Sequence, residues 1–63
     1  MAITLKAARI NAGKTQEEVG NHVGKTKITI RSYENYNSTP DVETAKKIAE
    51  YYGMSVDDIV WSK

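Results

Sequence analysis

The segment from residue 15 to residue 34 constrains the fold more than any other part of the sequence. Thr15 stands three residues before Glu18, the spacing at which the two side chains satisfy each other's free backbone amides at the start of a helix. Thr26 can cap a second helix in the same sense, and Gly24 can form the tight turn between the two. The two predicted helices are Gln16 to about Val23 and Lys27 to Tyr33 or Glu34.

The second of these predicted helices has an apolar side and a basic side. Ile30 and Tyr33 have a three-residue spacing that suits an inward face, whereas Lys27 and Arg31 would point elsewhere. In the preceding helix, Gly20 costs roughly 1 kcal/mol relative to alanine. We therefore expect the next helix to approach Gly20 too closely for any side chain to fit. The pair of helices suggests a helix-turn-helix that inserts one helix into DNA.

Three further helices are predicted on either side of this pair. They span Thr4 to Ala12, Asp41 to Tyr52, and a short segment that Ser55 opens with Asp58 three residues later. The apolar face of the fourth helix would comprise Val42, Ala45, Ile48, Ala49 and Tyr52. Residues 1–63 are thus predicted to form one all-α domain, a compact bundle of five short helices.

The size of the chain limits its stability. A domain of 63 residues buries only about 60% of its unfolded surface, so its core is marginal. The chain has no cysteine, which excludes disulfides and thiolate metal sites as sources of stability. It contains neither a long apolar run nor a signal-peptide pattern, so we expect a cytoplasmic protein.

The charge of the chain is unevenly distributed. Residues 1–40 contain six basic and three acidic residues, whereas residues 41–63 contain three basic and five acidic ones. Between Val19 and Tyr33 there are three cations and no anion. A surface that faces phosphates needs such a local excess of lysine and arginine. The alternative is a solvated basic face without a ligand.

The order and spacing of several motifs resemble the Cro/C1-type (Xre) helix-turn-helix family, with its lambda-repressor-like fold, over about residues 4–60. The resemblance implies a bacterial or phage-encoded protein. The motifs are Leu5-Lys6-x-x-Arg9, Thr15-Gln16-Glu17-Glu18-Val19, Val23-Gly24, Thr29-Ile30, Tyr33-Glu34-Asn35, Thr39-Pro40-Asp41, Ile48-Ala49-Glu50 and Gly53-Met54-Ser55-Val56-Asp57-Asp58-Ile59. The resemblance implies that the helix from Lys27 lies in the major groove of DNA and that the preceding helix crosses the backbone.

The resemblance also implies roles for individual side chains. The positions that would read bases are Lys27, Ile28, Arg31 and Ser32. The positions that would contact the DNA backbone are Gln16, Lys25, Thr26 and Asn35, and the Tyr36 hydroxyl is a further candidate for a phosphate contact. Lysine and arginine suit guanine O6 and N7, isoleucine suits the thymine methyl group, and serine suits either kind of base edge.

Arg9 and Glu34 have a structural role in this family, where they resemble a buried ion pair between two helices. Removing one partner of such a pair would cost roughly 3–5 kcal/mol. Three positions depart from the family pattern. Lys25 stands where an apolar residue is usual, Ile28 replaces a common polar residue, and Tyr36 stands where glycine often ends the helix. Either Asn35 or Tyr36 is therefore expected to be left-handed.

Nothing in the sequence predicts an enzyme, a cofactor, a metal site or a small-molecule ligand. His22 has no partner histidine or cysteine and is expected on the surface. Tyr51, Tyr52 and Trp61 suit core or dimer packing better than a base-stacking platform. Asp57 and Asp58 suit the first turn of the predicted fifth helix, where anions favour the helix dipole, rather than a catalytic carboxylate pair.

Two functions from different classes remain. The first is a sequence-specific regulator of transcription, expected to be a repressor, that binds double-stranded DNA as a homodimer on a two-fold operator. The candidate dimer surface comprises Val56, Val60 and Trp61. The second is a protein-interaction module that keeps the helical fold without binding DNA. The basic, acid-free run favours the first hypothesis.

Overall fold

The computed structural model describes residues 2–63, and Met1 of the predicted 1–63 domain lies outside them. Each α-helix begins directly after a side chain that accepts a hydrogen bond from a backbone N–H three residues later. These capping residues are Thr4, Thr15, Thr26 and Asp41. The helices are α1 (Leu5–Asn11), α2 (Gln16–Val23), α3 (Lys27–Glu34) and α4 (Val42–Tyr51).

The predicted boundaries of α2 and α3 are confirmed. Thr15 and Glu18 form the full capping box: the Thr15 N–H donates to Glu18 Oε1 over 2.8 Å, and the Glu18 N–H donates to Thr15 Oγ1 over 3.1 Å. Thr26 Oγ1 accepts from the Thr29 N–H at the start of α3. Gly24 ends α2 with a φ of 74°, in the left-handed region that glycine adopts without strain. Local capping therefore determines both helices.

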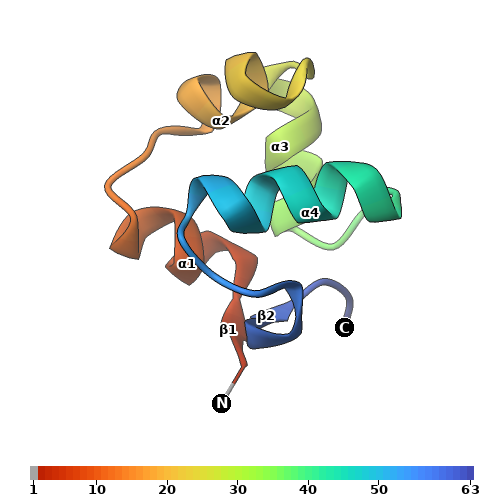
Figure 1. Cartoon of the computed structure of the whole chain (residues 1–63). Coiled ribbons are helices and arrows are strands. Elements are labelled where there is room, and N and C mark those ends of the chain that lie inside the picture. Colours follow the sequence, from red (N-terminus) through yellow and green to blue (C-terminus); the bar gives the residue numbers. More distant parts are fainter. Residues whose placement is uncertain (1) are drawn as a thin grey trace.

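The core lies where the helices meet. Its largest fully buried side chains are Leu5, Val19, Ile30 and Ile48, one from each helix. Figure 1 shows α4 crossing the middle of the molecule, with α2 on one side of it and α1 on the other. Val42 does not join the core as predicted, because it lies in the first turn of α4 and is 71% exposed. Within residues 2–63, no helix is long and apolar enough to cross a membrane.

The predicted fifth helix is wrong. Ser55 accepts a hydrogen bond from the N–H of Asp57, two residues later, and opens only one 3₁₀ turn, η1 (Val56–Asp58). The chain then extends as β2 (Ile59–Val60), which pairs in parallel with β1 (Ile3–Thr4). Two consecutive β-branched residues favour this extended conformation. The described chain thus forms four α-helices and a small parallel sheet. Figure 1 shows this sheet at one end of the molecule, beside the N-terminus.

Candidate nucleic-acid interface

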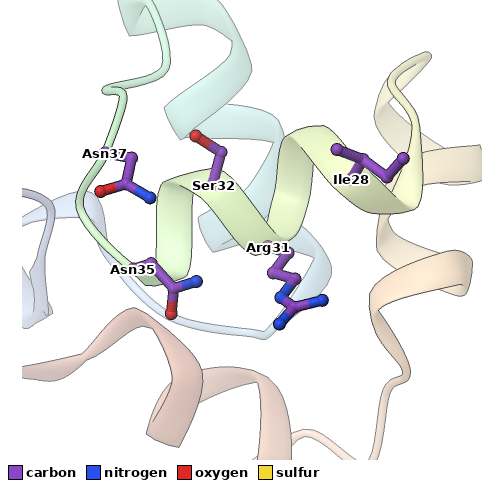
Figure 2. A pocket seen from close by; sticks show the side chains of 5 residues that line it. All are labelled: Ile28, Arg31, Ser32, Asn35 and Asn37. Atoms are coloured by element: carbon purple, nitrogen blue, oxygen red, sulfur yellow. The ribbon is translucent and has the colours of Figure 1, made fainter.

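The solvent side of α3 and the loop after it form a shallow hollow of about 360 Å³. Its lining residues are Ile28, Arg31, Ser32, Asn35 and Asn37. Figure 2 shows these side chains distributed along α3 and onto the following loop. Ile28 is 78% exposed, the highest value among the exposed large apolar side chains of the described residues. The hollow therefore presents one apolar group, one cation and several amide and hydroxyl groups to a ligand.

The packing of α3 determines which of its residues face solvent. Ile30 and Tyr33 are buried against the core, as their spacing predicted. Because successive helical residues are about 100° apart, Lys27, Ile28 and Arg31 are turned outward, and all three are exposed. The structure thus brings the four predicted base-reading residues onto the free part of one helix, with Ser32 partly covered at the edge.

Two predicted backbone contacts lie at the turn between α2 and α3. Lys25 is exposed, and its N–H donates to the Gly20 carbonyl over 2.8 Å. The Thr26 side chain is also exposed, although its hydroxyl already caps α3 and lies 3.1 Å from the Thr29 hydroxyl. A Cβ atom at Gly20 would lie within 3.2 Å of three backbone atoms of this turn, which confirms the predicted close approach.

A buried ionic network lies beside this surface. Arg9 Nε donates to Glu34 Oε2 over 2.6 Å, and Arg9 Nη2 donates to Glu34 Oε1 over 3.3 Å. The Glu34 side chain is 2% exposed and the Arg9 side chain 13% exposed. Arg9 Nη1 also donates to the Lys14 carbonyl, and Gln16 Nε2 donates to Glu34 Oε1 over 3.0 Å. The structure therefore joins α1, the start of α2 and the end of α3 through one carboxylate.

The Tyr36 side chain is bonded within the domain. It adopts a φ of 60°, the left-handed conformation expected at this position, whereas Asn35 remains right-handed. The Tyr36 hydroxyl donates to the Val60 carbonyl over 3.1 Å and accepts from the Leu5 N–H over 3.4 Å. This hydroxyl links β2 to the start of α1 and already uses its one proton there, which argues against a phosphate contact through Tyr36, and that contact stays an untested prediction.

Asn37 was not among the site residues predicted from the sequence, where only Asn35 and Tyr36 of this segment were given a role. The Asn37 N–H donates to the Ser32 carbonyl over 3.0 Å, and a hydrogen bond of 2.8 Å joins the Ser32 and Ser38 hydroxyls. These bonds hold the loop against the end of α3, so that Asn37 lines the hollow beside Asn35. In the sequence, the polar amide side chain of Asn37, directly after Tyr36, is the only signal that could have indicated a place in this site.

The residues suggested for a dimer surface are all half-buried within one chain. Val56 and Trp61 pack against the core, and Trp61 Nε1 donates to the Val56 carbonyl over 2.9 Å. Val60 is partly exposed beside them. The more exposed large apolar side chains are Ile10, Ile28 and Val42. Dimerisation through the first group remains a prediction.

The aromatic residues outside this surface have structural surroundings. His22 is exposed and stacks on Tyr51 with ring centroids 4.0 Å apart, and the Lys14 ammonium lies 4.7 Å from the Tyr51 ring centroid. Tyr52 is buried, and burial, followed by the nearby Glu34 carboxylate, raises the pKa of its hydroxyl. No group of three potential metal-ligating residues (His, Cys, Asp or Glu) occurs within residues 2–63.

The chain is similar to known helix-turn-helix proteins. A family model described as Helix-turn-helix matches residues 5–59. The chain is 34% identical to the cryptic phage CTXphi transcriptional repressor RstR of Vibrio cholerae over 89% of its own length. The match covers 50% of that repressor, so the chain spans half the length of this relative.

A second relative is similar in size. The chain is 32% identical to YgzD of Bacillus subtilis (strain 168), an uncharacterized HTH-type transcriptional regulator, over 90% of its own length and 86% of that protein. No solved structure matches the chain.

Proposed function

Since the chain belongs to the helix-turn-helix family of the Cro/C1 type, we propose that it is a sequence-specific, DNA-binding regulator of transcription. The observation that carries this proposal is the outward side of α3. Lys27, Ile28 and Arg31 are exposed there, while Ile30 and Tyr33 fix the helix to the core. A rigid helix with free cationic and apolar side chains suits the major groove, which admits one α-helix.

The chemistry of the exposed side chains supports different contacts with DNA for different residues. Lys27 and Arg31 donate to guanine O6 and N7, Ile28 contacts a thymine methyl group, and Ser32 pairs with either kind of base edge. The proposed backbone contacts are Gln16, Lys25, Thr26 and Asn35, to which we add Asn37. Tyr36 is removed from this set because its hydroxyl is bonded within the domain.

We further propose that two copies bind one two-fold operator and repress transcription. A module of this size makes few base contacts, so two copies about 34 Å apart on one face of the duplex supply the affinity together. Val56, Val60 and Trp61 are the proposed contacts between the copies, since these apolar groups are only half-buried in a single chain. The name of the Vibrio cholerae relative, a transcriptional repressor, supports repression rather than activation.

Selection of bound sequences from a random duplex pool, repeated at two salt concentrations, tests the proposal. We expect one enriched half-site, its inverted repeat at a fixed spacing, and weaker binding at high salt because counterions are released from phosphates. Enrichment of a single unpaired half-site would contradict the dimer. Absence of enrichment at both salt concentrations would contradict DNA binding and favour a protein-interaction module.

A further inference from the structure

Glu34 does more in this structure than pair with Arg9. Its Oε1 atom accepts a hydrogen bond from Gln16 Nε2 over 3.0 Å and lies 3.3 Å from Arg9 Nη2, while Oε2 accepts from Arg9 Nε. Gln16 is the first residue of α2, where backbone amides are unpaired and attract anions. We propose that Glu34 is a positioning residue for the DNA backbone contact: it holds the Gln16 carboxamide in one orientation at the start of α2. This inference rests on the proposed function.

The first step of the argument concerns the direction of the carboxamide. A glutamine side chain can turn its oxygen and nitrogen through half a rotation, and only the nitrogen donates. An ionised carboxylate only accepts, so Glu34 binds the nitrogen and rejects the flipped orientation. One N–H of Gln16 is used in this bond. The second N–H is left to donate, as a phosphate oxygen requires.

The second step concerns charge. A lone carboxylate close to a phosphate would repel it, and Glu34 is buried, so water screens its charge poorly. The Arg9 guanidinium offsets this charge with two hydrogen bonds to the carboxylate. The network of Arg9, Glu34 and Gln16 therefore presents an oriented amide without a net negative charge.

The third step concerns the two helices that would contact DNA. Glu34 is the last residue of α3, and Arg31 lies three residues earlier on the exposed side of the same helix. Arg9 also donates to the Lys14 carbonyl in the segment that leads into α2. The carboxylate thus fixes the start of α2 relative to the end of α3. A phosphate bound at Gln16 would set the depth at which Arg31 enters the groove.

A double-mutant cycle on DNA affinity tests this coupling. The variants are Gln16→Ala, Glu34→Gln and the double variant, each titrated with the selected operator and with an unrelated duplex at two salt concentrations. We expect Gln16→Ala to weaken binding to both duplexes by about tenfold without changing the salt slope, because an uncharged amide releases no counterion. Glu34→Gln should weaken both by a similar factor, and the double variant should bind no worse than Gln16→Ala.

Two controls separate positioning from folding. Tyr36→Phe removes a hydroxyl that bonds the Val60 carbonyl and the Leu5 N–H outside this network, so it should lower the melting temperature and leave the affinity of the folded protein within about twofold of wild type. Gln16 is the only glutamine of the sequence, so its side-chain amide protons can be assigned directly in an NMR spectrum. In the wild-type protein without DNA, one of them should be shifted and exchange more slowly than those of the exposed Asn21.

The outcomes are distinct. The positioning role would be overturned if the double variant lost affinity by the product of the two single losses, or if the Gln16 amide protons resembled those of Asn21. Either result would leave the proposal of DNA binding standing. Wild-type protein that binds neither duplex would instead refute the proposed function, and the NMR measurement would still decide whether Glu34 holds Gln16. Should Glu34→Gln fail to fold, the same NMR measurement on the wild-type protein replaces it.

Discussion

A Cβ atom at Gly20 would lie 2.9 Å from the backbone carbonyl oxygen of Lys25. This oxygen belongs to the turn between α2 and α3, and the next two residues of the turn lie almost as close. A side chain at position 20 would therefore push the two helices apart. Since a backbone carbonyl cannot rotate away as a side chain can, the contact fixes the geometry of the helix pair.

Gly20→Ala is accordingly expected to destabilise the protein although alanine is the better helix former. Alanine gains roughly 1 kcal/mol of helix propensity, but the overlap with the turn should leave a net loss of about 1–3 kcal/mol. A thermal melt followed by circular dichroism measures the change. Asn21→Ala, at the neighbouring exposed position, is the matched control and should leave the melting temperature equal or slightly raised. An unchanged melt for Gly20→Ala would show that the turn can yield.

Arg31→Ala should weaken specific DNA binding with almost no effect on folding, because Arg31 is exposed and lies in the proposed base-reading row. Loss of a bidentate contact to guanine costs about 1–3 kcal/mol of discrimination. Affinities for operator and unrelated duplex measure the loss. Lys25→Ala is the contrasting variant: it should weaken binding to both duplexes equally and reduce the salt slope by about one. Normal discrimination by Arg31→Ala would refute its assignment.

Ile28 should make binding sensitive to a single methyl group in the operator. Replacing the contacted thymine by uracil removes only the C5 methyl, and the lost apolar contact is worth about 0.8 kcal/mol, or about fourfold in affinity. Titration of duplexes that carry one such substitution at a time identifies the position. The same substitutions should have no effect on Ile28→Ala. Equal sensitivity of this variant would mean that another residue contacts the methyl group.

The carboxylates that cap α2 and α4 should make the stability of the protein depend on pH. The Thr44 N–H donates to Asp41 Oδ1 over 2.8 Å, and this bond lowers the pKa of Asp41 below its ordinary value of 3.8. A carboxyl group whose pKa is lower in the folded state stabilises the protein above the unfolded pKa, and the gain is lost as pH falls through the folded pKa. In the same sense, the Thr15 N–H lowers the pKa of Glu18 below 4.5.

Asp41→Asn tests this dependence, because asparagine also caps a helix but does not titrate. The wild-type protein should melt at a higher temperature than Asp41→Asn at pH 6, and the difference should decrease as the pH falls below about 4. Melting temperatures measured between pH 6 and pH 2.5 give the comparison. A constant difference over this range would mean that the charge of Asp41 contributes nothing.

Tyr36→Phe should lower stability without affecting DNA binding. The hydroxyl that it removes donates to the Val60 carbonyl and accepts from the Leu5 N–H. We expect a loss of about 1 kcal/mol, the net value of a typical hydrogen bond. Chemical denaturation measures the loss, and operator affinity at 25 °C should be equal to that of wild type. Weaker binding with unchanged stability would restore the phosphate contact that the structure argues against.

Those parts of the fold that depend on neighbouring residues were predictable from the sequence. The capping box at Thr15, the turn at Gly24 and the inward face of α3 follow from spacings of three or four residues. The prediction of a fifth helix failed because Ile59 pairs with Ile3, at the other end of the described chain. No local sequence pattern indicates that pairing. Capping chemistry at Ser55 suits a 3₁₀ turn as well as a helix.

In the candidate site, too, features set by neighbouring residues were predictable, and features set by distant residues were not. Exposed Lys27, Ile28 and Arg31 follow from helical periodicity and from the family resemblance. The role of the Tyr36 hydroxyl depends on β2, and the position of Asn37 depends on bonds between its loop and α3. The contact between Gln16 and Glu34 joins two helices, so neither residue reveals it in the sequence.

The parallel pairing of β1 and β2 also bears on the order of folding. Thr4 belongs to β1 and caps α1, so the direction in which α1 leaves the sheet depends on the partner strand. β2 is the last element of the described chain to be synthesised, and contacts between such distant segments form late because long loops must close first. We expect α2 and α3 to associate early, while α1, with Arg9, docks only in the closing step.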